Sequence, residues 1–87
     1  MSVLVRHRAE GLTEELYDQV AGPLVDSVRQ SPGFILHVAF TDAKGFCVAE
    51  LWDSQEQHDS WFDANVRPNV PLEIQTEVVQ IHALHTP

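Results

Sequence analysis

The spacing of apolar residues along this 87-residue chain alternates between the period of a strand and the period of a helix. Residues 2–8, 34–41, 46–52 and 72–84 follow strand-like patterns, whereas residues 13–30 and 54–66 repeat at helical spacing. The order is therefore β-α-β-β-α-β. With right-handed crossovers it predicts a ferredoxin-like α+β fold, in which a four-stranded antiparallel sheet carries two helices on one face. We expect one domain over residues 1–87, because half of this length rarely sustains a core.

Local signals indicate where the helices begin and end. Thr13 and Ser54 are typical N-cap residues, and Gln57 completes a capping-box pattern with Ser54. Pro23 lies inside the first helical segment and lacks an N–H, so a kink or a restarted helix is expected there. Residues 42–45 form the predicted hairpin turn between the second and third strands.

Composition and charge exclude several classes of function. Thirteen acidic and five basic residues give a net charge of -8, which argues against nucleic acid and anionic membrane surfaces as partners. No apolar run is long enough for a membrane span and residues 1–6 lack a signal-peptide layout, so a cytoplasmic protein is expected. Cys47 is the only cysteine, which excludes an internal disulfide. We expect it to be an inert apolar residue on the helix-covered side of the sheet.

The length of the hairpin turn decides which residues of the two central strands face each other. A loop of two or four residues places His37 opposite Glu50, whereas a loop of odd length would separate them across the sheet. In the first register, one face of the hairpin mixes polar and apolar side chains. That face carries Ile35, His37, Ala39, Thr41, Phe46, Val48, Glu50 and Trp52.

The opposite face of the hairpin is wholly apolar, so we expect it to lie beneath the helices. The mixed face would then remain uncovered, although it is too apolar to face water. A second copy closing over it as a dimeric α+β barrel would solve this, and the homodimer would enclose His37 and Glu50 in an apolar cavity. One face of the last strand also lines this cavity. We favour the face with His82, Gln80 and Val78 over the face with Ala83, Ile81 and Val79.

Three segments together resemble a known family. Ser-Pro-Gly-Phe-Ile-Leu-His-Val at 31–38, Val-Ala-Glu-Leu-Trp-Asp-Ser at 48–54, and a helix with Trp61 and Phe62 that ends near Pro68 resemble the antibiotic biosynthesis monooxygenase-like superfamily of dimeric α+β barrels. The resemblance extends over roughly residues 12–70 and implies the fold and the dimer. It also implies cofactor-free oxygenase chemistry on polyketide or quinol substrates as one of the activities in the group.

The haem-degrading branch of this superfamily is a poorer match. Its members combine a strand Trp with an iron-ligating His late in the second helix and an Asn on the first strand. Trp52 matches the Trp, but residues 63–68 contain no His and residues 2–8 contain no Asn. We therefore do not expect haem degradation, and we predict that the protein uses no cofactor.

Eight side chains are candidates for the site. His37 would act as a general acid or base and Glu50 would orient it, unless the pair serves only to fix the hairpin register. Trp52 and Phe46 would stack on a flat aromatic ligand or simply pack. The other candidates for the pocket wall are Ile35, Tyr17, Trp61 and His82.

No metal site is predicted. His7, His58 and His85 are expected at the surface or at strand ends, and His82 and His85 would lie on opposite faces of a strand. The chain also lacks His-Glu-x-x-His, Gly-rich phosphate loops and nucleotide fingerprints.

Two functions are compatible with these observations. The first is a small cofactor-independent pathway enzyme, monooxygenase-like or of a proton-transfer or cyclase type, that acts on a hydrophobic aromatic or polyketide-like molecule. The second is a non-catalytic dimer of the same fold that binds a small molecule or is purely structural. An open cavity near His37 favours the first, and a cavity filled by Trp52 and its symmetry mate favours the second.

Overall fold

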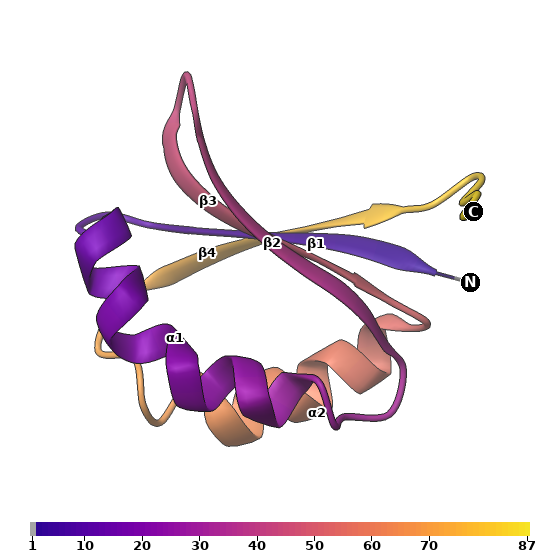
Figure 1. Ribbon diagram of the computed structural model, residues 1–87, viewed down its shortest axis with the longest axis horizontal. Coiled ribbons are helices and arrows are strands. Elements are labelled where there is room, and N and C mark those ends of the chain that lie inside the picture. The colour runs from indigo at the N-terminus through magenta and orange to yellow at the C-terminus, as the bar shows by residue number, and fades with distance from the viewer. Residues whose placement is uncertain (1) are drawn as a thin grey trace.

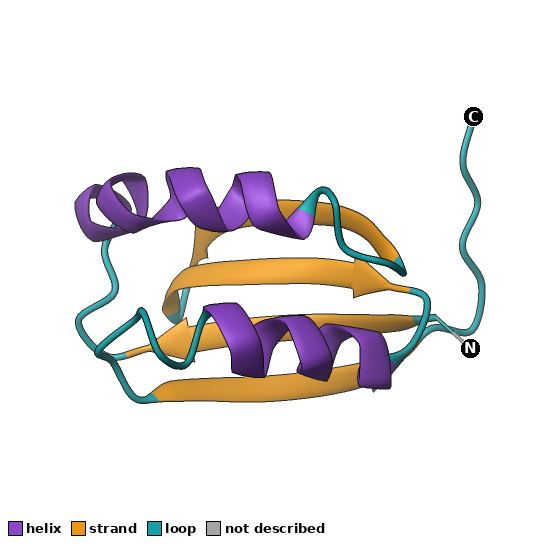
Figure 2. Ribbon diagram, turned by 90° about the horizontal axis from the view of Figure 1, so that it is seen from below, coloured by secondary structure: helices purple, strands orange, loops and turns teal. Residues whose placement is uncertain are grey.

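The computed structural model describes residues 2–87 and contains the six predicted elements in the predicted order. The strands form one antiparallel sheet in the order β2-β3-β1-β4, and both helices lie on the same side of it (Figures 1 and 2). This is the ferredoxin-like arrangement expected from the sequence. The elements are β1 (Val3–Ala9), α1 (Glu14–Val28), β2 (Phe34–Asp42), β3 (Gly45–Trp52), α2 (Gln55–Asn65) and β4 (Ile74–Gln80).

Both predicted N-caps are present. Thr13 Oγ1 accepts a hydrogen bond from the backbone N–H of Leu16, and Ser54 Oγ accepts one from that of Gln57, each at 3.2 Å. α1 continues through Pro23, and the axis of the helix bends in Figure 1. Among the described residues, neither helix has the length and apolarity that a membrane span requires.

The last strand is shorter than the sequence predicts. β4 ends at Gln80, and residues 81–87 leave the body of the protein (Figure 2). Within β4, Val78 pairs with Val5 of β1, and Val5 also pairs with Glu50 of β3. Val78 therefore lies on the same face of the sheet as Glu50, as favoured from the sequence, but His82 lies beyond the sheet.

The β2–β3 hairpin has the predicted register over most of its length. His37 lies opposite Glu50, and the same pairing continues to the turn. The prediction is wrong at the start of β2, where Phe34 rather than Ile35 pairs with Trp52. A β-bulge after Phe34 causes the shift. It directs the Phe34 ring toward the indole of Trp52, which it meets edge-on with 5.5 Å between ring centroids.

The face of the sheet that packs beneath the helices is the opposite of the one predicted. The mixed face, with His37 and Glu50, points toward α1 and α2. The apolar face is open, and on the edge strand β2 its residues Leu36, Val38 and Phe40 are 37–45% exposed. The core beneath the helices consists of Val3, Val5, Val28, Trp52, Trp61, Phe62 and Val66.

Hydrogen bonding explains why the mixed face can be buried. Trp52 is completely buried on this side, and its indole N–H donates to the Glu50 carboxylate at 3.1 Å. Glu50 in turn pairs with His37, so the polar groups of this face satisfy one another. Cys47, expected on the helix-covered side, belongs to the open face of the sheet, where it is nevertheless buried.

Gly33 fixes the turn between α1 and β2. Its φ angle of 86° lies in the left-handed region, and a Cβ at this position would collide with the side-chain amide of Gln57. The carbonyl of Gly33 also accepts a hydrogen bond from the N–H of Asp53 at 2.7 Å. The turn therefore connects the start of β2 to the end of β3.

Gly33→Ala is expected to lower the free energy of unfolding by about 1–2 kcal/mol, because the left-handed backbone disfavours a side chain. Gly22→Ala is the matched control. Gly22 lies within α1, and a Cβ there meets nothing within 4 Å, so this change should stabilise by up to about 1 kcal/mol. Urea denaturation of both variants measures the two effects, and equal shifts would contradict the assignment.

Candidate functional site

A cavity lies between α1 and the sheet. Its volume is about 80 Å³, and its lining is almost entirely apolar. Side chains of α1, α2 and the segment that leads into β4 form most of the wall. Apart from Arg8 at its edge, the polar residues among those that line it are His7, Tyr17, His37 and Glu50.

The helix α1 is weakly anchored above this cavity. Val28, at its C-terminal end, is its only buried residue. Its apolar stripe, including Val20, Leu24 and Val25, lines the cavity, and of these three only Leu24 also packs against the core. A ligand bound between α1 and the sheet would bury this apolar stripe. Burial of apolar surface would favour the binding of a hydrophobic molecule.

A chain of three side chains leads from α1 to the interior of the sheet. The Tyr17 hydroxyl lies 2.6 Å from Nε2 of His37, and Nδ1 of His37 lies 2.7 Å from Oε2 of Glu50. Tyr17 comes from α1, His37 from β2 and Glu50 from β3. The predicted pairing of His37 with Glu50 is therefore present, and Tyr17 extends it to the cavity wall.

The pKa shifts assign the protons in this chain. Burial raises the pKa of Glu50, but hydrogen bonds from His37 and Trp52 outweigh it, so the pKa is lowered overall and the carboxyl is ionised. An ionised carboxylate only accepts hydrogen bonds, so Nδ1 of His37 carries the proton and Nε2 accepts from Tyr17. Burial, with the nearby charge of Glu50, raises the pKa of Tyr17 and keeps its hydroxyl protonated. In a neutral His37, Nε2 is therefore the nitrogen with the free lone pair that faces Tyr17.

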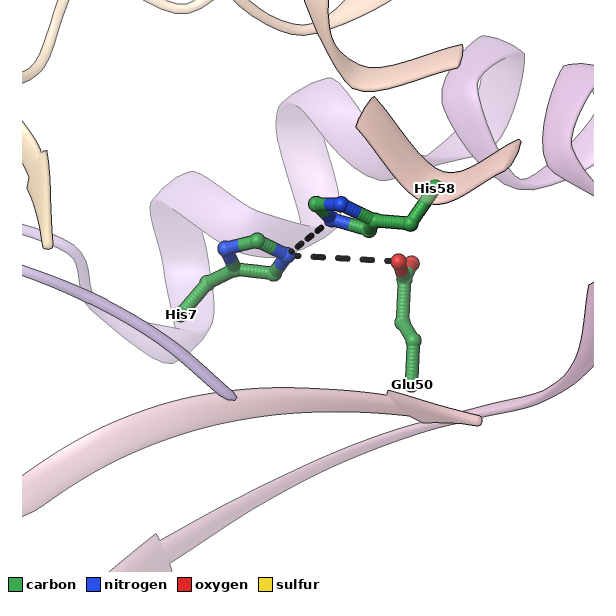
Figure 3. Close-up of side chains that lie close together, drawn as sticks. All are labelled: His7, Glu50 and His58. Carbon is green, nitrogen blue, oxygen red and sulfur yellow. Dashed lines mark hydrogen bonds and ion pairs between the residues drawn. The ribbon is translucent and has the colours of Figure 1, made fainter. Parts of the chain in front are cut away.

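Two histidines expected at the surface lie in the interior, which corrects the prediction from the sequence. His7 is 7% exposed and His58 is 1% exposed, and their Nε2 atoms are 3.0 Å apart (Figure 3). Nε2 of His7 also lies 4.0 Å from Oε1 of Glu50. The three side chains offer ligand atoms that all lie within 4.8 Å of one another, so they are able to hold a metal ion.

The sequence carried a signal for both histidines. His7 continues the alternation of Val3 and Val5, so it projects to the same side of β1 as these two core residues. His58 precedes Trp61 by three residues and Phe62 by four, which places it on the buried face of α2.

The structure brings only part of the predicted site together. Trp52 is buried in the core, Phe46 contacts the Tyr17 ring with 5.4 Å between centroids, and Ile35 lies at the bulge. None of these three lines the cavity, and His82 is exposed beyond β4. The predicted residues that do line it are His37, Glu50, Tyr17 and Trp61.

Comparison with known proteins finds similarity in structure but not in sequence. No sequence family and no curated protein matches the chain. SnoaB, a cofactor-independent oxygenase from Streptomyces nogalater, superposes with a TM-score of 0.62 at 8% identity, over 95% of this chain and 93% of that chain. A monooxygenase from the gene ActVA-Orf6 of Streptomyces coelicolor, in complex with nanaomycin D, gives 0.60 at 17% identity, over 99% and 92%.

A third similar structure is that of a protein with a different activity. The heme-degrading protein Rv3592 from Mycobacterium tuberculosis, in a heme-free form, superposes with a TM-score of 0.62 at 23% identity over 100% of both chains. Together these structures confirm that the chain has the fold of the antibiotic biosynthesis monooxygenase-like proteins. At such identities the similarity concerns the fold.

Acidification should destabilise the protein through His7. Burial lowers the pKa of His7 from 6.5 to about 4, so between these values the unfolded chain binds a proton that the folded chain does not. The stability present above pH 6.5 is therefore lost as the pH falls toward 4. We expect a loss of about 1–2 kcal/mol between pH 7 and pH 5, measured by urea denaturation of the metal-free protein.

His7→Gln should remove most of this dependence on pH, whereas His85→Gln, a change in the exposed C-terminal segment, should retain it. An unchanged pH profile in the His7 variant would contradict the assignment.

Proposed function

We propose that the protein is a small monooxygenase-like enzyme that acts on a hydrophobic, aromatic or polyketide-like molecule bound between α1 and the sheet. The observation that carries this proposal is the Tyr17–His37–Glu50 chain, which reaches an apolar cavity. The likeness in fold to a cofactor-independent oxygenase and to a monooxygenase supports the class of reaction.

His37 is the proposed general base. A substrate proton passes to Nε2, directly or through the Tyr17 hydroxyl, and the Glu50 carboxylate stabilises the imidazolium that forms. The substrate anion is left in an apolar cavity, where its charge is poorly solvated and it is reactive toward oxygen. Isomerisation or cyclisation would use the same proton transfer without oxygen.

Oxygenation of this kind needs no external reductant when the substrate contains an activated methylene group. One atom of O₂ becomes the carbonyl oxygen on that carbon, and the other leaves as water with the two methylene hydrogens. The substrate itself supplies the electrons. The residues then have to remove one proton, exclude water and hold the substrate near His37.

The size of the cavity sets a condition on the substrate. At about 80 Å³ it is smaller than the roughly 300–1,000 Å³ of typical ligand pockets. A molecule with more than one ring therefore requires α1 to move away from the sheet. Val28 is the only buried residue of α1, so the main losses in such a movement are the contacts of Val28 and Leu24 with the core and the hydrogen bond between Tyr17 and His37.

We also propose that the protein is a homodimer that pairs through the open face of the sheet. Leu36, Val38 and Phe40 form an apolar patch on β2 that no other part of the described chain covers. A second copy would bury it, and the core of so short a chain gains from such burial. In this arrangement the cavities lie on the outer sides of the paired sheets, contrary to the enclosed site expected from the sequence.

The proton-transfer role is tested by oxygen uptake with dihydroxyanthrone, which contains an activated methylene group, and with naphthohydroquinone as a comparison probe that lacks one. His37→Ala should lower turnover by about 10²–10⁴-fold, and Tyr17→Phe should lower it while keeping the aromatic ring. His85→Ala is the control and should leave turnover unchanged, because it lies in the exposed C-terminal segment.

Two results would overturn the enzymatic proposal. Full turnover in the His37 variant with a lowered thermal stability would make the His37–Glu50 pair structural. Stabilisation of the wild type by both probes without oxygen uptake or product would indicate a binding protein.

The dimer is tested by sedimentation at micromolar concentration. The wild type should sediment as a dimer, and Val38→Lys should shift it toward monomer, because a charge replaces an apolar side chain in the patch. Asp18→Lys on the exposed side of α1 is the control and should not change the assembly. A stable wild-type monomer would reject the proposed interface.

A further inference from the structure

We propose that His7, Glu50 and His58 form a binding site for a divalent transition-metal ion such as zinc. The sequence predicted no metal site, and the proposal does not depend on the function proposed above. The three residues come from β1, β3 and α2 and converge in the interior of the protein (Figure 3). Each is at most 7% exposed.

The spacing of the ligand atoms suits one small ion. Ligand atoms at about 2.0–2.1 Å from a common ion lie roughly 2.8–3.4 Å apart, for angles between 90° and tetrahedral. The two Nε2 atoms are 3.0 Å apart, and Oε1 of Glu50 lies 4.0 Å from Nε2 of His7. All three ligand atoms lie within 4.8 Å of one another, so the Glu50 carboxyl has to move toward the two histidines for one ion to reach all three.

Each histidine is oriented through its other ring nitrogen. Nδ1 of His7 lies 3.2 Å from Oγ1 of Thr76, and Nδ1 of His58 lies 2.8 Å from Oδ1 of Asp59. Such outer contacts fix the rings of metal-binding histidines and direct Nε2 toward the ion. Glu50 has outer contacts as well, since it accepts hydrogen bonds from Trp52 and His37.

The charges also favour a cation between these residues. The ion pairs of Glu50 within residues 2–87 involve only histidines, so no lysine or arginine compensates its buried carboxylate. A histidine binds a metal ion in its neutral form, through the lone pair of a ring nitrogen, and the two Nε2 atoms here lie 3.0 Å apart. Two neutral imidazoles and one carboxylate are a ligand set typical of zinc or ferrous iron.

The site would keep an open coordination position on the cavity side. His7 and Glu50 line the cavity, whereas His58 lies behind them in the core and packs against the ring of Phe62. Three protein ligands leave a fourth position for water or for an oxygen atom of a bound molecule. We infer that a ligand with a phenol or enol oxygen would bind the ion directly.

The alternative arrangement is a chain of hydrogen bonds without an ion. In that arrangement Thr76 donates to His7, Nε2 of His7 donates to Nε2 of His58, and His58 donates to Asp59. This chain satisfies every ring nitrogen, and Oε1 of Glu50, which lies 4.0 Å from Nε2 of His7, accepts instead from the indole of Trp52. Metal titration distinguishes the two arrangements.

The experiment titrates chelator-treated protein with Co²⁺, whose visible absorption reports its ligands, and measures Zn²⁺ binding by calorimetry. The wild type should bind one ion per chain and gain thermal stability. His58→Phe keeps a ring in contact with Phe62 and should weaken binding by about 100-fold or more. His85→Gln, in the exposed C-terminal segment, should bind like the wild type.

The outcomes separate this proposal from the function proposed above. His37→Ala removes no ligand, so it should still bind Co²⁺ within about tenfold of the wild type even if turnover is lost. If His58→Phe does not fold, as judged by circular dichroism, His7→Gln takes its place with the same expectation. The proposal is overturned if the wild type binds no ion, or if binding of wild-type strength survives the loss of His58 or of His7.

Discussion

The hydrogen bonds to the buried carboxylate of Glu50 organise the interior of this protein. One oxygen accepts from the indole of Trp52 and the other from His37. A carboxylate that is 1% exposed is tolerable only when such donors replace water. These hydrogen bonds hold Trp52 and Glu50 together on one face of the sheet. The helices cover that face.

Two polar networks meet at Glu50. On one side, His37 and Tyr17 lead to the wall of the cavity, where a proton can be exchanged with a ligand. On the other side, His7 and His58 form a pair of opposed nitrogen atoms. Because the two sides contact the two oxygens of one carboxylate, a charge placed at one side changes the electrostatic potential at the other. The networks would therefore respond to each other.

Much of the fold could be predicted from the sequence, because short-range signals specify it. Thr13 and Ser54 determine where the helices begin, and the turn length determines that His37 faces Glu50. The covered face could not be predicted from polarity, since the buried polar residues are satisfied by partners distant in the chain. His7 and His58, for example, are separated by 51 residues, and no local pattern reports their contact.

The errors in the candidate site have a different, local cause. The bulge after Phe34 displaced Ile35, and the early end of β4 left His82 outside the sheet. Both are small changes at the ends of strands, where sequence signals are weakest. Residues near the middle of strands or helices, such as His37, Glu50 and Trp61, do line a cavity together, but it lies beneath the helices and not on the face predicted to be uncovered.

The strand order has a consequence for how the chain folds during synthesis. β1 leaves the ribosome first, yet it lies between β3 and β4, and His7 contacts Thr76 across 69 residues. Among the strands, only the β2–β3 hairpin can form from neighbouring segments. The first strand must therefore remain unpaired until β3 has been synthesised, and its second edge stays open until β4 follows, so a nascent chain exposes a strand edge during that interval.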